Sequence, residues 1–385
     1  MFRLSRFMEA LVTGGDVPPR RAPPGPVVIW NVIRRCNLTC RHCYSLSNDT
    51  DFKGELSTEE ALAVLDQLKA ARVPAVIFSG GEPLLRPDLP VLLRRAKALG
   101  MHVSVSSNGT LLEAEMAATL ADCGVDYYGV SLDGLAPTHD VFRRLEGAFD
   151  AALRGVRLAR DSGIKTGIRM TLTEANADQL PAVVALMEAE GLDKFYLSHF
   201  NYAGRGRKHQ ADDAQHAATR RTLDWLFEHV YARAQAGQAG DFVTGNNDAD
   251  GVYLLNWIQH RAPGRVADMR QRLLNWGGNA TGVWVANIDN LGNVHPDTMW
   301  WQHTLGNVRQ RPFADIWADC SDPLMAGLKA RPRPLEGRCG RCPSREMCNG
   351  NTRVRAFATT GNAWAADPGC YLTDAEVGLL EEVPC

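Results

Sequence analysis

Residues 27–44 read VVIWNVIRRCNLTCRHCY, an apolar β-branched run that leads directly into three closely spaced cysteines. The first half has the composition of a buried strand. The second half places Cys36, Cys40 and Cys43 on one short loop after that strand. Three thiolates on one loop can hold three irons of a cubane cluster and leave the fourth iron open. Zinc is the alternative, but it prefers four ligands, and His42 is poorly placed in sequence to be the fourth.

The segments that follow alternate between strand-like and helix-like patterns. Ser57 and Glu60 fit a capping box, which predicts a helix between the first two strands. Six β/α repeats predict a parallel sheet curled into a partial (β/α)6 TIM-like barrel, with its chemistry in the loops after the strands. The predicted fold class is therefore α/β. The five further strands, each rich in β-branched or aromatic residues and ending in turn residues, are predicted at 75–81, 102–109, 127–134, 166–173 and 194–200.

The β/α alternation is expected to stop near residue 235. Residues 276–300 read as a β-hairpin that turns at 290–293, and the last 50 residues show little periodicity. We expect a small cysteine-rich C-terminal domain held together by metal rather than by a large core. Four spaced cysteines satisfy an auxiliary 4Fe–4S cluster, with a four-cysteine zinc site as the alternative. These cysteines are Cys339, Cys342, Cys348 and Cys370.

The length of 385 residues exceeds one ordinary domain. We divide the chain into an N-terminal extension (1–26), a partial barrel (27–235), a bridging segment (236–282) and the cysteine-rich domain (283–385). In the extension, the apolar residues near one helical face predict a helix that packs on the barrel. These are Phe2, Leu4, Phe7, Met8 and Leu11.

Charge and hydropathy exclude several classes of protein. The formal net charge of −2 gives no basic field that would favour nucleic acid. No apolar run approaches the roughly 18 residues of a membrane-spanning helix, and the N-terminus lacks a cleavable signal pattern. Ten cysteines gathered in two main clusters indicate metal or redox chemistry in the cytoplasm rather than a disulfide framework. Cys123 is expected in the core, and Cys320 and Cys385 receive no role.

Two motifs resemble the signatures of the radical SAM superfamily. One is Cys36-x3-Cys40-x2-Cys43 followed by Tyr44, and the other is Ser79-Gly80-Gly81-Glu82-Pro83 after the second strand. The resemblance implies that the open iron binds S-adenosylmethionine (SAM) and that one electron cleaves it to a 5′-deoxyadenosyl radical. It makes the three cysteines catalytic and gives the methionine amino group to the backbone of Gly80–Pro83. Further positions that match SAM contacts are Ser107 and Asn108 (ribose), Ser131, Asp133, Arg143 (carboxylate), Arg169 and Thr171.

The C-terminal cysteines resemble the SPASM extension of radical SAM enzymes. His295-Pro296 is followed by Asp297, where many SPASM proteins carry another cysteine, so one auxiliary cluster is expected. Over the whole chain, segments such as FVTGNNDADGVY and WAADPGCYLTDAE resemble the radical SAM enzymes of haem d-one biosynthesis. That resemblance implies removal of two propionate side chains from didecarboxysirohaem, an iron tetrapyrrole. It also implies a low-potential electron donor as a partner.

An iron tetrapyrrole predicts two kinds of protein contact. An axial imidazole for the iron would come from His199, after the sixth strand, with His295 and His303 as alternatives. Any of these histidines could equally be an ordinary packed residue. The polar residues Asn246, Asn247 and Asp250 are expected to position the substrate. Arginines that could bind its carboxylates are Arg205, Arg207, Arg353 and Arg355.

Two other functions stay open at this point. A peptide-modifying radical SAM maturase would share the barrel and the SPASM-like domain, although no separate peptide-recognition domain is evident before residue 27. A non-catalytic zinc or iron–sulfur scaffold is the second alternative. Such a scaffold would not need the Gly-Gly-Glu-Pro motif, Asn108 or Arg143, and all of these are present.

Overall fold

The computed structural model describes residues 1–17, 24–238 and 240–379. Cys385 and residues 18–23 of the expected N-terminal extension lie outside the described residues. All six predicted strands are confirmed, together with the parallel pairing between them. They are β1 (Val27–Asn31), β2 (Ala75–Ser79), β3 (His102–Ser107), β4 (Tyr127–Ser131), β5 (Thr166–Leu172) and β6 (Lys194–His199).

The sheet extends beyond these six strands, in the order β10-β9-β8-β1-β2-β3-β4-β5-β6-β7. The expectation that the alternation stops near residue 235 is wrong by one unit, because β7 (Asp241–Gly245) pairs in parallel with β6. This strand reads Asp-Phe-Val-Thr-Gly and holds only two large apolar residues before a polar turn, so its pattern does not stand out. On the other edge, β8 (Val285–Ile288) pairs in parallel with β1.

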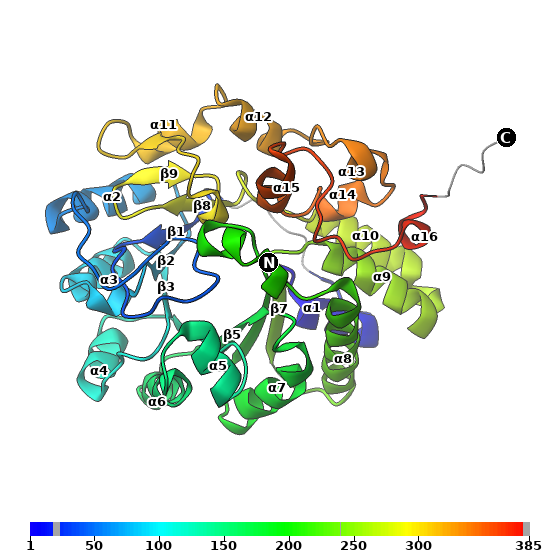
Figure 1. Cartoon of the computed structure of the whole chain (residues 1–385), viewed down its shortest axis with the longest axis horizontal. Coiled ribbons are helices and arrows are strands. Elements are labelled where there is room, and N and C mark those ends of the chain that lie inside the picture. The colour runs from blue at the N-terminus through cyan, green and yellow to red at the C-terminus, as the bar shows by residue number, and fades with distance from the viewer. Residues whose placement is uncertain (18–23, 239, 380–385) are drawn as a thin grey trace.

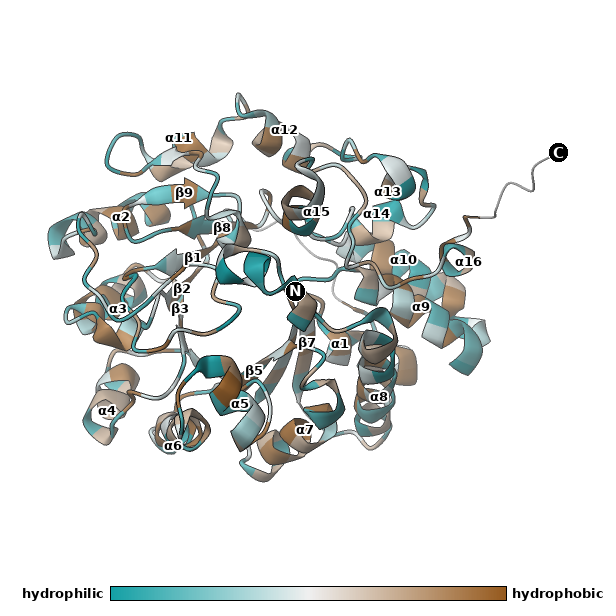
Figure 2. Ribbon diagram, in the orientation of Figure 1, coloured by the Kyte–Doolittle hydropathy of each residue, from teal (hydrophilic) through white to brown (hydrophobic). Residues whose placement is uncertain are grey.

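Helices surround the curved sheet on its outer side (Figure 1). The Ser57–Glu60 capping box is confirmed: the Glu60 amide donates to Ser57 Oγ at 3.2 Å, and the Ser57 amide donates to Glu60 Oε2 at 2.8 Å. Figure 2 shows both hydrophobic and hydrophilic stretches on these helices, as expected for helices with one face on a sheet. They are α2 (Thr58–Ala70), α3 (Leu89–Ala98), α4 (Ala114–Asp122), α5 (Ala136–Arg143), α6 (Ala148–Asp161), α7 (Leu180–Ala189) and α8 (His216–Gln235).

The N-terminal residues form α1 (Leu4–Thr13), which contacts α8 and β7, as predicted. Phe2 precedes this helix and forms an antiparallel bridge with Thr244 on β7, through backbone hydrogen bonds of 2.7 and 2.8 Å. The side chains of Phe2, Leu4, Phe7, Met8 and Leu11 are all buried. The start of the chain therefore covers the free edge of the sheet at β7.

The C-terminal third begins with α9 (Ala249–Arg261) and α10 (Val266–Trp276) and continues into the predicted hairpin, which is confirmed as β8 and β9 (Asn293–His295). A two-residue strand, β10 (Gly306–Asn307), extends it. Helices α11–α16 then lie together on one side of the barrel (Figure 1). They are α11 (Phe313–Ala318), α12 (Pro323–Lys329), α13 (Gly337–Arg341), α14 (Arg345–Cys348), α15 (Arg353–Thr360) and α16 (Asp374–Val377).

Short 3-10 turns complete the described chain: η1 (Pro83–Leu85), η2 (Ala177–Gln179), η3 (Gly204–Lys208), η4 (Gln210–Asp212), η5 (Pro263–Arg265) and η6 (Thr298–Trp300). Within the ranges given above, no helix is long and apolar enough to cross a membrane. Every described cysteine is a free thiol. As predicted, Cys123 is buried, whereas Cys320 is exposed.

Candidate active site

A cavity of about 1300 Å³ runs along the inner face of the sheet. This volume exceeds the roughly 300–1000 Å³ of a typical small-molecule site, so the cavity has room for two ligands. Its wall includes the ends of the parallel strands, where barrel enzymes carry their chemistry. The residues predicted from the sequence that line it are Cys36, Cys40, Cys43, Tyr44, Gly80, Gly81, Ser107, Asn108, Ser131, Arg143, Arg169, Thr171, His199, Arg205 and Asn246.

The three cysteines of the first loop cluster at this cavity, and Cys36 and Cys40 are each 7% exposed. Each sulfur lies near a polar group. The Leu38 amide donates to Cys36 Sγ at 3.4 Å, Arg143 Nη1 donates to Cys40 Sγ at 3.5 Å, and Ser45 Oγ lies 3.3 Å from Cys43 Sγ. Hydrogen bonds to cysteine sulfur stabilise thiolates and tune an iron–sulfur cluster. This donor set fits a cluster that is held by three cysteines.

Burial makes these thiols hard to ionise without a metal. It raises the pKa of Cys36 to about 12 and also raises the pKa of Cys40, although the Arg143 charge opposes the rise at Cys40. Since the thiolate is the form that binds metal, a cation must supply the energy that keeps these sulfurs deprotonated. Among the residues that the structure describes, no three His, Cys, Asp or Glu side chains converge on a single metal ion.

The Gly80-Gly81 pair is needed for packing against the cysteine loop. A Cβ on Gly80 would lie 2.5 Å from the Ile33 carbonyl oxygen, and one on Gly81 would lie 2.2 Å from the Arg35 carbonyl oxygen. The Gly81 amide donates to Ile33 O at 2.7 Å. The radical SAM resemblance assigns the backbone of these glycines to the methionine amino group of SAM. The structure adds a reason within the chain, because only glycine lets the two loops touch.

Glu82 lies behind the cavity wall, with no exposed surface. Its carboxylate accepts hydrogen bonds from Ser107 Oγ (2.8 Å), from the Asn108 amide (2.8 Å) and from the Leu84 amide (3.1 Å). Burial raises the pKa of Glu82 to about 7, against these hydrogen bonds. Glu82 therefore joins the loop after β2 to the end of β3, and neither Glu82 nor Pro83 lines the cavity itself.

Asn108 and Tyr44 are both hydrogen-bonded at the cavity wall. Asn108 Nδ2 donates to Asn37 Oδ1 at 2.9 Å and lies 3.8 Å from Cys36 Sγ. The Tyr44 hydroxyl accepts from Asn31 Nδ2 at 2.8 Å, and the same amide group reaches the Gly80 carbonyl at 3.1 Å. These contacts fix the polar groups that surround the cysteine loop.

Two arginines line the cavity in different electrostatic states. Arg143 forms a buried ion pair with Asp133, and Asp133 is fully buried with its other oxygen bonded to the Thr171 amide at 2.7 Å. Burial alone would raise the pKa of Asp133, but the Arg143 charge leaves it below its ordinary value. Arg169 has no ion pair within the described ranges, and its Nε makes no hydrogen bond there. Arg169 is therefore the better placed of the two to receive a carboxylate of a ligand.

The structure brings two of the predicted substrate residues together. His199, at the end of β6, borders the cavity, and its Nε2 lies 3.0 Å from Asp250 Oδ2 on α9. Asp250 is fully buried behind the histidine. Asn246 lines the cavity, and its Nδ2 donates to Ser198 Oγ at 2.8 Å.

The other predicted substrate residues are engaged elsewhere in the fold. His295 is buried, with Nδ1 2.8 Å from the His303 carbonyl and Nε2 3.3 Å from Asp289, and His303 in turn contacts Asp322. Asn247 is held by Gly369 O and Asn351. Arg353 and Arg355 are 1% exposed inside the C-terminal domain, and Arg207 is exposed. The residues that do not line the cavity are thus His295, His303, Asn247, Arg207, Arg353 and Arg355.

Sequence reasoning missed residues that complete the site from distant segments. Thr244 Oγ1 and Tyr371 Oη both donate to Asp250. Arg205, by contrast, is one of the arginines predicted from the sequence, and its Nε donates to the Cys40 carbonyl at 2.7 Å, which ties the loop after β6 to the cysteine loop. Thr244 and Tyr371 carry no spacing signal relative to His199, because they lie on other elements of the fold.

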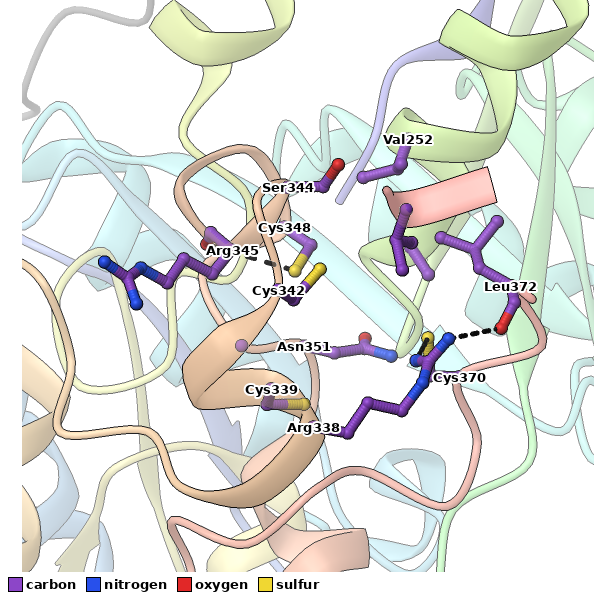
Figure 3. A pocket seen from close by; sticks show the side chains of 13 residues that line it. Val252, Arg338, Cys339, Cys342, Ser344, Arg345, Cys348, Asn351, Cys370 and Leu372 are labelled. Atoms are coloured by element: carbon purple, nitrogen blue, oxygen red, sulfur yellow. Dashed lines mark hydrogen bonds between the residues drawn. The ribbon is translucent and has the colours of Figure 1, made fainter. Parts of the chain in front are cut away.

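The four C-terminal cysteines line a second, smaller cavity (Figure 3). Cys339 and Cys342 come from α13 and the residue after it, Cys348 ends α14, and Cys370 comes from the segment before α16. Arg338 Nη1 donates to Cys370 Sγ at 3.3 Å. Four thiols around one cavity fit a second metal group.

Comparisons with known proteins agree with this geometry. Residues 30–187 match the radical SAM superfamily. The chain is 50% identical over 387 residues to the Pre-heme d1 synthase of Dinoroseobacter shibae, covering 100% of this chain and 95% of that protein. It is 44% identical over 360 residues to the Fe-coproporphyrin III synthase of Methanosarcina barkeri, covering 92% and 90%.

A solved structure shows the same fold at low sequence identity. Streptococcus suis SuiB bound to its precursor peptide SuiA is similar with a TM-score of 0.70 and 17% identity, over 91% of this chain and 76% of that chain. At this identity the likeness extends to the fold alone.

Proposed function

This chain belongs to the radical SAM superfamily, and from that premise we propose that it is the radical SAM enzyme that removes two propionate side chains of didecarboxysirohaem in haem d-one biosynthesis. The observation that carries the proposal is the 50% identity to a Pre-heme d1 synthase over the whole chain. The large cavity, with room for a second ligand beside SAM, supports it. Fold alone would not identify the substrate.

We assign one 4Fe–4S cluster to Cys36, Cys40 and Cys43, and SAM to the adjoining cavity wall. When bound, the cluster would supply the electron for reductive cleavage of SAM, which is the source of the radical chemistry at the propionate side chain. Around it, the backbone of Gly80 and Gly81, which lines the cavity, would receive the amino group, and Ser107 and Asn108 would receive the ribose. Arg169, paired in register with Ser131 across β4 and β5, would bind the SAM carboxylate in place of Arg143, because Asp133 already neutralises Arg143.

The remaining residues hold the site together. Glu82 and Arg205 fix the loops on either side of the cysteines, and Arg143 stabilises the Cys40 sulfur. Radical chemistry depends on a fixed geometry of the reacting groups, and these contacts would help to fix it. A low-potential donor and a cytoplasmic location remain parts of the proposal.

The second cavity would hold one auxiliary 4Fe–4S cluster on Cys339, Cys342, Cys348 and Cys370. The contacts of Asp297 support a single auxiliary cluster, because its carboxylate is engaged within the chain. It accepts hydrogen bonds from Thr281 Oγ1 and from the Met299 amide, the latter at 2.8 Å. Metal analysis of anaerobically reconstituted protein tests this assignment. About eight irons per chain fit two cubane clusters, whereas zinc in place of iron would overturn the enzyme assignment.

The function is tested with reconstituted protein, SAM, a low-potential reductant and didecarboxysirohaem, followed by mass spectrometry of 5′-deoxyadenosine and the tetrapyrrole. We expect both propionate side chains to be lost, and both products to disappear in Cys40→Ala. Formation of 5′-deoxyadenosine without any change in the tetrapyrrole would refute the substrate and would favour a peptide substrate.

A further inference from the structure

Asp250 is a fully buried carboxylate that collects hydrogen bonds from three separate elements. Its Oδ2 lies 3.0 Å from His199 Nε2 on β6 and accepts from Thr244 Oγ1 on β7. Its Oδ1 accepts from Tyr371 Oη at 2.7 Å, in the segment between α15 and α16. A buried carboxylate is costly unless it is hydrogen-bonded, and three donors satisfy this one.

This arrangement decides which nitrogen of His199 carries the proton. Because the carboxylate is an acceptor, Nε2 carries the hydrogen and Nδ1 keeps a free electron pair. The His199 ring borders the cavity, and its Nδ1 makes no hydrogen bond to any residue that the structure describes. A histidine that gives one ring N–H to a carboxylate and presents the other nitrogen to a cavity has the geometry of a metal ligand.

We propose that His199 Nδ1 binds the iron of the tetrapyrrole substrate, and that Asp250 and Tyr371 are positioning residues for that bond. The inference rests on the proposed function, since that substrate carries the iron. Asp250 supplies the negative charge that makes the imidazole a stronger donor. The charge and the ring orientation are fixed before the substrate arrives, so little ordering is left to pay on binding.

Tyr371 connects this ligand to the C-terminal cysteine cavity. It directly follows Cys370, whose thiol lines that cavity. The Tyr371 ring is 2% exposed and lies parallel to the His199 ring, with centroids 6.2 Å apart, while Tyr253 packs edge-on against it. The segment that brings a cysteine to the auxiliary cluster therefore also brings a hydroxyl to Asp250. Loss of order at Cys370 would weaken the support of His199.

The experiment measures binding of didecarboxysirohaem and of the same macrocycle without iron, to reconstituted protein without reductant or SAM. Absorption titrations give the two affinities. We expect the wild type to bind the iron form at least about tenfold more tightly than the metal-free form. His199→Ala should abolish this difference while leaving the metal-free affinity unchanged, and added imidazole should restore the iron-form spectrum.

Asp250 and Tyr371 are tested by the same ratio of the affinities for the iron and the metal-free macrocycle. Asp250→Asn keeps the size of the side chain but removes its charge, and should weaken iron-form binding about 10- to 100-fold. Tyr371→Phe keeps the packing and should weaken it about threefold to tenfold, the effect of one hydrogen bond. Tyr253→Phe is the matched control, because its hydroxyl bonds Asp224 outside the network, and it should leave the ratio unchanged.

The outcomes separate this inference from the proposed function. If His199→Ala binds the iron form as the wild type does, or loses both forms equally, His199 is not the iron ligand, whereas propionate removal can still be observed. If the wild type binds neither form, the proposed substrate itself is wrong and the inference falls with it. If Asp250→Asn does not fold, Tyr371→Phe alone decides the positioning role.

Discussion

Two bidentate ion pairs of similar geometry allow a direct test of burial in the C-terminal domain. Arg355 donates to Asp367 through Nε (3.0 Å) and Nη2 (2.9 Å), with side chains that are 1% and 0% exposed. Arg220 donates to Glu376 at 2.8 and 2.6 Å, but these side chains are 30% and 22% exposed. We predict that removal of the carboxylate charge lowers the free energy of unfolding far more in the Arg355–Asp367 pair than in the Arg220–Glu376 pair.

The magnitude follows from what remains after the substitution. In Asp367→Asn, the Arg355 guanidinium keeps its bonds to Phe200 O (3.1 Å) and Asn246 O (2.6 Å) but loses its counter-ion at a buried position. Breaking a buried pair in this way costs about 3–5 kcal/mol. Glu376→Gln leaves Arg220 partly solvated, and an exposed pair contributes about 0.2–1 kcal/mol.

Anaerobic urea unfolding of the cluster-loaded protein, followed by tryptophan fluorescence, measures both losses. The double variant Arg355→Met/Asp367→Leu should recover most of the stability, because it removes both buried charges together. The reasoning is refuted if Asp367→Asn costs no more than Glu376→Gln, or if the double variant is less stable than Asp367→Asn alone. The outcome also bears on the site, since Arg355 holds the carbonyls of Phe200 and Asn246 at the ends of β6 and β7.

Four further predictions concern the clusters, the loops and pH. Cys348→Ser should lower iron by about four atoms per chain while SAM cleavage capacity at the first cluster is retained, as measured by iron assay and 5′-deoxyadenosine yield. In a calorimetric titration, Gly81→Ala should weaken SAM binding at least about tenfold, because its Cβ would lie 2.2 Å from Arg35 O. Gly264→Ala is the control, because its Cβ would have no atom within 4 Å. Arg169→Leu should raise the KM for SAM, whereas Arg143→Leu should lower the amount of iron that the protein retains. An unchanged KM for SAM in Arg169→Leu would count against Arg169 as the residue that binds the SAM carboxylate. Hydrogen bonding to Arg220 lowers the pKa of Glu376 from its ordinary value of 4.5 to about 2. The ion pair therefore stabilises the fold above pH 4.5, and this stabilisation is lost as the pH falls toward 2. The difference in the free energy of unfolding between wild type and Glu376→Gln, measured by urea titration, should close below pH 4.5.

Local pattern predicted the parts of the fold that depend on neighbouring residues. The first six strands and the hairpin after residue 283 are visible in sequence because each has enough alternating or β-branched residues to mark it. The strand β7 is not, since its sequence DFVTG has only two large apolar residues and runs into a polar turn. The cysteine spacings likewise predicted two groups of thiols, and the structure places each group at one cavity.

Partners across the fold could not be predicted in the same way. His199 and Asp250 were each selected as single polar residues, yet their 3.0 Å contact arises only because α9 packs behind the end of β6. The radical SAM resemblance assigns Arg143 to the SAM carboxylate, and nothing in the sequence marks its ion pair with Asp133. The sequence separation between Asp133 and Arg143 is short, but only the turn into α5 brings the two charges together.

The C-terminal residues form part of the wall of the large cavity and are not a detached appendage. Strand β8 continues the barrel sheet through its pairing with β1, and Asp297, Met299 and Thr352 line the same cavity as Cys36. Position 297, where many of the SPASM proteins that the C-terminus resembles carry another cysteine, is an aspartate here, and its carboxylate caps η6 through the Met299 amide. That cap fixes the turn that carries Met299, so the Asp297 carboxylate stabilises this part of the cavity wall. Within the proposed function, this wall would bound the space that the flat macrocycle occupies.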